Sequence, residues 1–403
     1  MFITRIVRRL SEQRGQTLIL FAGIFTVIAI VGAIVIDFGV WFSERRGAQT
    51  DSDLIALAGV YELLTTGSAY ADVDIATQQS AVANGIDPVE DLQNLAVRSL
   101  EFPDGYETDP DYCHTATDTG GRLNAVVLDV DHDSQAFFAG IFGIGTPDIG
   151  AHACARAGSL RSTSGLRPWA VARFTSDCFE WDEELGQSVP QFGQECIFRT
   201  DNSSQVGSIR LGPDEGDDCS GSGGAGASVY QENIIEASPS ICEIGDMVDV
   251  EPGLNEGPTK QALAILLSTE GECDELNSFS LNLAEPDGID DFVESFIPVS
   301  GIIGPDETYL DANCKTPRAI SLVIVDEFDG LGFDSVPIVG FAAFFLVACD
   351  VLDNDGNVIE ISRDCDFSGS KYQIRGFFMR IVLLEGDIGA FDEFGTNVIR
   401  LAE

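Results

Sequence analysis

The sequence predicts an α+β protein in which a single N-terminal transmembrane helix and a helical stalk precede mainly β, disulfide-containing exoplasmic domains. Three observations lead to this class. An apolar run near the N-terminus is long enough to cross a bilayer, and all ten cysteines lie beyond it. The later part of the chain alternates short runs rich in Val, Ile and Phe with turn residues. With 403 residues, the chain has room for the anchor and two globular domains.

The apolar run begins at Leu18, ends at Ile36 and contains 19 residues without a charge. As an α-helix it would span about 28 Å, close to the hydrocarbon thickness of a bilayer. A cleavable signal peptide is the alternative, but its apolar region is only about 7 to 15 residues long and a small-x-small site follows it closely. Here the first such triplet starts at Ala56, far downstream. We therefore expect an uncleaved, single-pass anchor.

The charges that flank this run predict its orientation. Four arginines and one glutamate precede it, a net charge of +3, and the positive-inside rule places that end in the cytoplasm. Arg45 and Arg46 on the far side weaken the asymmetry without reversing it. We expect a cytoplasmic basic segment at residues 1–16, a transmembrane helix at 17–40 and an exoplasmic remainder, in a bacterial cytoplasmic membrane.

The chain beyond the anchor shows helical periodicity. An apolar stripe recurs at spacings of three and four residues, which indicates an amphipathic stalk helix over residues 41–66. We expect the stripe to pack on the first domain, with packing on a partner helix as the alternative. Its members are Leu54, Leu57, Ala58, Tyr61 and Leu64.

Two exoplasmic domains are expected, an α+β domain at residues 67–158 and a mainly β domain at 166–403. The small polar segment 159–165 between them suggests a linker. In the first domain we expect strands at 123–130 and 149–157 with a short helix at 134–142. In the second we expect a long acidic, Gly-rich loop at 212–227, a helix at 259–267, and strands at 319–325, 336–351, 358–362 and 372–384.

The formal charge is −44, from 66 acidic and 22 basic residues. Such a surface repels nucleic acid, so we expect no nucleic-acid partner. Adaptation to salt or general solubility explains the acidity best, and cation binding is the alternative.

The cysteines favour disulfides in an oxidising compartment. The chain contains neither a C-x-x-C pair nor a Cys/His cluster at zinc spacing, so up to five disulfides are the better explanation. Cys178 with Cys196 and Cys349 with Cys365 are candidate local pairs, and the spacing leaves the other connectivities open. The ten are Cys113, Cys154, Cys178, Cys196, Cys219, Cys242, Cys273, Cys314, Cys349 and Cys365.

Oxygen-bearing side chains at Asp353, Asp355 and Asn357 resemble the start of a calcium loop. The resemblance stops at the sixth position, where an EF-hand needs Gly and this chain has Val358. Apolar strands flank the segment, so we expect a hairpin turn and keep calcium as the weaker alternative.

The sequence offers no catalytic or cofactor site. Gly221, Gly223 and Gly226 match G-x-G-x-x-G, but we expect neither the preceding strand nor the following helix of a phosphate site, and nearby acidic residues would repel phosphate. The three histidines form no zinc pair, and no G-x-S-x-G is present. We therefore expect a non-enzymatic protein without cofactor or small-molecule substrate.

One N-terminal pattern resembles a known family. Arg14, Gly15 and Gln16 precede the apolar helix, and Asp37 and Gly39 follow it, which is similar to the TadE/TadG-type proteins of Tad (tight adherence) or Flp pilus assembly. That resemblance implies a membrane protein crossing once, with an exoplasmic domain that serves the assembly of adhesive pili. Glu44, Arg45 and Arg46, ahead of an alanine-containing helix, complete this N-terminal pattern. Weaker matches are the segments 137–139 and 151–157, Gly245, Asp246, Pro252, Gly253, and the segments 339–341 and 374–377.

One departure bears on processing. TadE-like pseudopilins carry a Glu five residues after the Gly at which a prepilin peptidase cuts, and this chain has Leu20 there. The resemblance therefore favours an uncleaved, TadG-like anchor. We expect a non-enzymatic component of Flp/Tad-type pilus assembly or cell-surface adherence, held by the lipid bilayer and by other pilus-assembly or envelope proteins. A cell-envelope adhesin or calcium-dependent surface protein is the alternative, and an exported hydrolase comes third.

Overall fold

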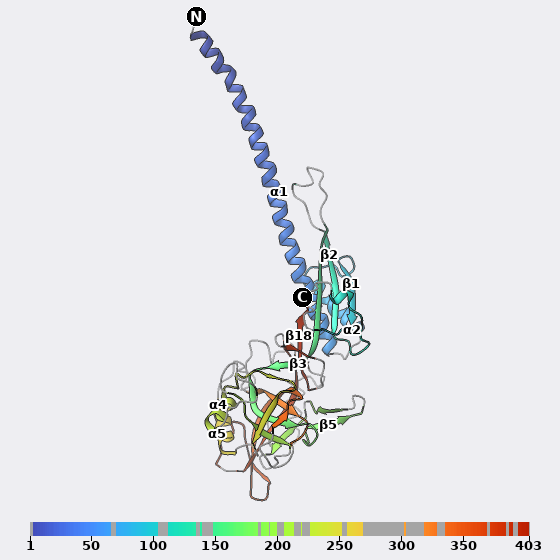
Figure 1. Cartoon of the computed structure of the whole chain (residues 1–403), viewed down its shortest axis with the longest axis vertical. Helices are drawn as coiled ribbons and strands as arrows, with labels where there is room; N and C mark the ends of the chain where they lie inside the picture. Colours follow the sequence, from blue (N-terminus) through green and yellow to red (C-terminus); the bar gives the residue numbers. More distant parts are fainter. Residues whose placement is uncertain are drawn as a thin grey trace. The chain divides into compact units, whose positions relative to one another are not determined.

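The computed structural model divides the chain into two compact units (Figure 1). The first unit comprises residues 1–63, 68–156 and 401–403, and the second comprises 64–67 and 157–400. The structure describes residues 3–65, 70–103, 112–133, 138, 148–183, 187–192, 194–199, 205–212, 219, 226–251, 256–268, 302–303, 318–328, 335–368, 371–383, 387–389 and 394–402.

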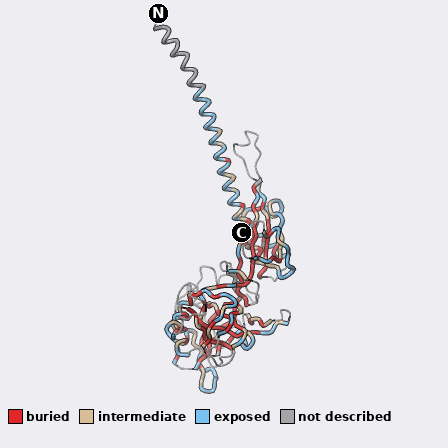
Figure 2. The backbone as a smooth tube through the Cα atoms, in the orientation of Figure 1, coloured by how far each residue is buried: buried red, intermediate tan, exposed pale blue. Residues whose placement is uncertain are grey.

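The first unit begins with α1 (Ile3–Thr65), one unbroken helix of 63 residues. No proline interrupts this stretch, so the expected anchor and stalk form a single rod of about 95 Å. Among the described helices, α1 is the one long and apolar enough to cross a membrane. Its side chains between Leu20 and Ile36 lie mainly exposed, with Phe21 at 69%, and Figure 2 shows this part in pale blue.

The stalk prediction is right about the helix and wrong about which face is buried. Leu54 is 45% exposed, whereas the buried stripe is shifted by one position along the helix. Gly59 explains the shift: a Cβ built there would lie 2.6 Å from Thr77 Cγ2 and 3.0 Å from Val126 Cγ1, so the absence of a side chain lets α1 pack closely on its neighbours. The buried positions of the stalk segment are Ala48, Ser52, Ile55, Ala56, Gly59, Val60, Leu63 and Leu64, of which Leu64 alone belongs to the expected stripe.

A three-stranded antiparallel arrangement packs with this stalk. The remaining elements are α2 (Tyr70–Ala83), β1 (Leu92–Arg98), α3 (Tyr112–Thr115), β2 (Ala125–Asp133) and residues 148–156 of β3 (Asp148–Thr163). Strand β2 pairs with β1 on one side and with β3 on the other. The two expected strands are confirmed with shifted ends, and the helix expected at 134–142 lies outside the described residues except for Phe138.

The expected linker is wrong, because β3 continues to Thr163 and contributes residues 157–163 to the second unit. The small polar side chains that suggested a linker are accommodated by hydrogen bonds. Ser162 is buried, and its hydroxyl donates to Asp387 Oδ2 at 2.7 Å. Gly165, with φ of +77°, makes the turn that follows this strand.

The second unit contains a mixed sheet in the order β18-β16-β14-β12-β4-β8-β10-β13. Most neighbours are antiparallel, while β12 with β4 and β16 with β18 are parallel. The elements are β4 (Leu166–Ala172), β5 (Phe179–Asp182), β6 (Gln187–Pro190), β7 (Cys196–Arg199), β8 (Val206–Ile209), α4 (Ala227–Ile235), β9 (Cys242–Glu243), β10 (Met247–Glu251), α5 (Glu256–Ser268), β11 (Ile302–Ile303), β12 (Ala319–Val325), β13 (Ser335–Pro337), β14 (Gly340–Leu352), β15 (Val358–Ser362), β16 (Tyr372–Leu383), β17 (Asp387–Ile388) and β18 (Thr396–Leu401).

Both faces of this sheet are covered, which explains its continuous apolar runs. Helices α4 and α5 contribute to a core with alternate residues of β4, β12 and β14, such as Trp169, Leu322 and Phe344. The intervening residues, such as Ala170 and Val323, belong to a second core on the opposite face. The helix expected at 259–267 and the strands expected in the last third are confirmed, except that 336–351 is two strands, β13 and β14.

Four disulfides join described residues. The two candidate local pairs, Cys178–Cys196 and Cys349–Cys365, are confirmed. Cys113–Cys154 in the first unit and Cys219–Cys242 in the second were left open by the spacing. Cys273 and Cys314 lie outside the described residues.

Candidate membrane-proximal site

The exposed apolar part of α1 ends at a buried carboxylate. Asp37 directly follows Ile36 and is only 1% exposed. Its Oδ1 and Oδ2 lie 3.1 and 3.0 Å from the backbone nitrogen of Phe138, which donates to them. A buried carboxylate without partners would be costly, so this contact stabilises the position of the helix beside Phe138. It joins residues 101 positions apart in the chain.

Apolar contacts continue the attachment along the next turns of α1. Ala48 is buried together with Ile149 and Ala151 of β3, and Trp41 packs against this group. Because Trp41 and Ala48 are two helical turns apart, they present one face of α1 to β3. The helix is therefore held to the first unit from Asp37 onward.

A polar cluster follows on the same face. The Gln49 side-chain amide donates to the backbone carbonyl of His152 and to Asp53 Oδ1, both at 2.9 Å. The ring of His152 packs edge-on to His114, with centroids 5.7 Å apart, and His114 Nε2 lies 3.6 Å from Asp129 Oδ1. Burial raises the pKa of Asp53, while the Gln49 hydrogen bond and the His152 charge lower it by less.

The side chains of this cluster are not arranged as the ligands of a metal ion. Among the residues that the structure describes, no group of three or more His, Cys, Asp and Glu side chains is arranged to hold a metal ion. The cluster instead links α1 to β3 and β2 by hydrogen bonds and ring contacts. These contacts hold elements of the first unit together.

The residues of the family pattern fall into three groups. Asp37 and Phe138, which belong to separate segments of the pattern, are joined by hydrogen bonds. Gly39 lies on the open side of α1, with no atom within 4 Å of a Cβ built there. Arg14, Gly15 and Gln16 are helical within α1, and their side chains lie outside the described parts. No such contact is predicted from the sequence, and the signal that could have indicated it is a lone carboxylate at the end of an apolar run.

The candidate calcium residues form the hairpin turn that the sequence predicts. Strands β14 and β15 pair across it, and Asp353 Oδ1 accepts hydrogen bonds from the backbone nitrogens of Asp355 at 2.9 Å and Asn357 at 2.8 Å. The backbone hydrogen bond from Asn357 is the main cause that lowers the pKa of Asp353. The carboxylate of Asp353 thus stabilises the turn through these hydrogen bonds.

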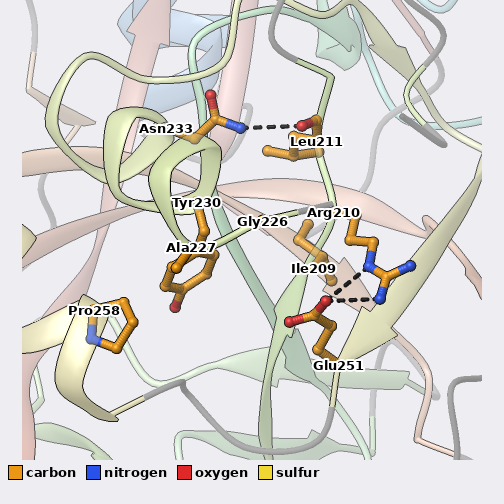
Figure 3. A pocket seen from close by; sticks show the side chains of 9 residues that line it. All are labelled: Ile209, Arg210, Leu211, Gly226, Ala227, Tyr230, Asn233, Glu251 and Pro258. Carbon is orange, nitrogen blue, oxygen red and sulfur yellow. Dashed lines mark hydrogen bonds and ion pairs between the residues drawn. The ribbon is translucent and has the colours of Figure 1, made fainter. Parts of the chain in front are cut away.

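A small pocket lies in the second unit beside the start of α4 (Figure 3). It offers about 120 Å³, well below the roughly 300 Å³ of the smallest usual ligand sites. Its polar groups are paired within the chain: Arg210 Nε and Nη2 each lie 2.8 Å from Glu251 Oε1, and Asn233 Nδ2 donates to the Leu211 carbonyl at 3.1 Å. Tyr230 hydroxyl contacts Trp169, Ser208 and Thr259, and its burial raises the tyrosine pKa.

The glycine-rich motif ends at this pocket. The expectation that no helix follows it is wrong, because α4 begins at Ala227, directly after Gly226. Gly221 and Gly223 lie outside the described residues. The pocket's small volume and the neighbouring Glu251 nevertheless argue against a pyrophosphate there.

Comparison with known proteins finds no family model, no curated protein and no solved structure that matches this chain. The resemblance to TadE/TadG-type proteins therefore stays a prediction from the residues of the N-terminal pattern.

Proposed function

We propose that this protein is a membrane-anchored, non-enzymatic component of Flp/Tad-type pilus assembly or cell-surface adherence. The observation that carries the proposal is the continuity of α1. One part of the helix exposes an apolar surface long enough to cross a bilayer, and the next part supplies buried residues to the first unit. Anchor and folded domain therefore share one rigid element, as expected of a protein that holds partners at a membrane.

The proposed topology places the N-terminus in the cytoplasm and the bulk of the chain outside. Two observations support it. Arginines precede the apolar segment, as the positive-inside rule requires for this orientation. The four disulfides between described residues all lie beyond that segment, and such bonds persist in oxidising compartments.

Support for the pilus role comes from the N-terminal pattern and its contact. Asp37, which the resemblance singles out, is buried against the backbone of Phe138. Both positions belong to the segments in which the chain resembles TadG-like proteins. A contact between two such segments gives the pattern a physical role: it sets how the first unit attaches to its anchor.

Topology is tested by adding protease to intact spheroplasts. We expect loss of the mass beyond the anchor, with a small protected fragment that contains the N-terminus. A cytoplasmic protein monitored in the same samples controls for lysis. Full protection of the chain would contradict the topology.

The role is tested by deleting the gene in its host and counting surface pili by electron microscopy, under conditions in which the wild type is piliated. We expect loss of pili, restored by the wild-type gene. Complementation with Val89→Thr, at an 87% exposed position, should match the wild type. If pili keep their normal number and length after deletion, the proposed assembly role fails.

A further inference from the structure

Phe138 lies at the level where α1 would leave the bilayer. Its backbone nitrogen is 3.0 Å from Asp37 Oδ2, and Asp37 is the residue next to Ile36 at the end of the apolar run. One residue of α-helix rises about 1.5 Å, whereas the headgroup layer on each side of a bilayer is roughly 5 to 7 Å thick. If α1 spans the membrane as proposed above, the Asp37–Phe138 contact lies within that layer.

The surface around this contact is apolar and open. Phe138 is 38% exposed, and Phe38 and Phe42 on the neighbouring turns of α1 are 52% and 64% exposed. In sequence, Phe138 belongs to a run without a charged side chain from position 134 to position 147, with phenylalanines also at 137 and 142. The carboxylate of this contact, Asp37, is itself buried and hydrogen-bonded, so it adds no exposed charge to the surface.

We propose that the outer surface of the lipid bilayer is the partner that covers this apolar surface, so that the first unit docks on the membrane through Phe138. Continuity with the exposed apolar part of α1 selects lipid over a protein partner. The same bilayer that would surround Leu20 to Ile36 reaches the next residues of the helix without a break. Aromatic side chains favour this interfacial depth.

The charge distribution agrees with such docking. A net charge of −44 would keep most of the surface away from anionic lipid, whereas an uncharged segment tolerates the headgroup layer. The Asp37–Phe138 hydrogen bonds fix Phe138 beside the helix, so docking needs no separate ordering of these two residues. The first unit would thereby be held by two points, the helix and the Phe138 surface.

The inference rests on the proposed membrane anchor, and its test separates the two. The full chain is placed in phosphatidylcholine nanodiscs, and tryptophan emission is compared with and without brominated phospholipids. Two such lipids are mixed, one brominated near the headgroup end and one near the methyl end of its acyl chains. The probe is Phe138→Trp. Phe25→Trp, within the apolar run, reports spanning, and Tyr70→Trp, 52% exposed and 33 residues past Asp37, is the matched control in the first unit. Emission of the three native tryptophans is subtracted using the unsubstituted chain.

We expect bromine to quench the added emission of Phe138→Trp and Phe25→Trp and to leave that of Tyr70→Trp unchanged. Quenching of Phe25→Trp alone would overturn docking while leaving the anchor intact. In that case, a blue shift of the Phe138→Trp emission without quenching would show that the residue is shielded from water but does not touch lipid. The surface would then be assigned to a protein contact. Absence of quenching in all three variants would overturn the anchor and the docking together.

Discussion

At the scale of single residues, two aspartates of this chain, one buried and one in a turn, accept hydrogen bonds from backbone amides. Asp37 accepts from Phe138, and Asp353 accepts from the two amides of its turn, 2.9 Å and 2.8 Å away. Charge-assisted hydrogen bonds of this kind hold a segment in one conformation, because ionised acceptors bind N–H groups more strongly than neutral ones. The two aspartates therefore act on structure: one attaches a helix, the other closes a hairpin.

The Asp353 turn predicts a pH dependence. Its pKa is lower in the folded protein than the ordinary value of 3.8, because the turn amides favour the charged form. A carboxyl with a depressed pKa contributes stability above its unfolded pKa, and that contribution is lost as the pH falls through the folded value. We expect Asp353→Ala to lower the melting temperature at neutral pH, and its difference from wild type to shrink below about pH 4.

Asp355→Ala is the matched control for this measurement, since hydrogen bonding by Asp355 in the turn uses its backbone nitrogen. Its melting temperature should follow the wild type at every pH. A constant difference between Asp353→Ala and wild type from neutral to acidic pH would show that the carboxylate charge does not hold the turn.

At the scale of elements, α1 combines two surfaces along one helix. Its first part exposes apolar side chains, and its later part buries a stripe that contains Gly59. Close packing at Gly59 sets the helix against α2 and β2, through Thr77 and Val126. Gly59 and the Asp37–Phe138 contact therefore contribute to the attachment of α1, together with the packing of Ala48 on β3.

Substitution at two glycines of α1 should give opposite effects. In Gly59→Ala the new methyl group would overlap Thr77, so we expect the first unit to lose about 1 to 3 kcal/mol of unfolding free energy. Gly47→Ala meets nothing within 4 Å, and the higher helix propensity of alanine should add up to about 1 kcal/mol. Native-state hydrogen exchange of the β2 amides measures both. Equal stability of the two variants would contradict close packing at Gly59.

At the scale of the whole molecule, the charge of −44 opposes folding through self-repulsion, and the disulfides offset part of that cost. Cys113–Cys154 closes the longest separation among the disulfides of the described residues, 41 positions. By loop-closure entropy such a bond contributes about 4 kcal/mol. Covalent links of this kind suit a protein that must fold with so many like charges.

Salt should therefore stabilise this protein. We expect the melting temperature to rise with NaCl, mostly below about 1 M, where the screening length has fallen to roughly 3 Å. CaCl₂ at matched ionic strength should give the same rise, because general screening is indifferent to the identity of the cation. An additional stabilisation at micromolar to millimolar calcium would favour the cation-binding explanation of the acidity.

Local patterns in the sequence were sufficient for several features: the apolar helix, the α+β class, two local disulfides and the hairpin at Asp353. Each depends on residues close together in the chain. The buried stripe around Gly59, the extension of β3 through the expected linker, the Cys113–Cys154 bond and the Asp37–Phe138 contact came only from the folded structure. They join segments far apart in sequence, and periodicity or spacing within one segment carries no information about which distant segment will face it.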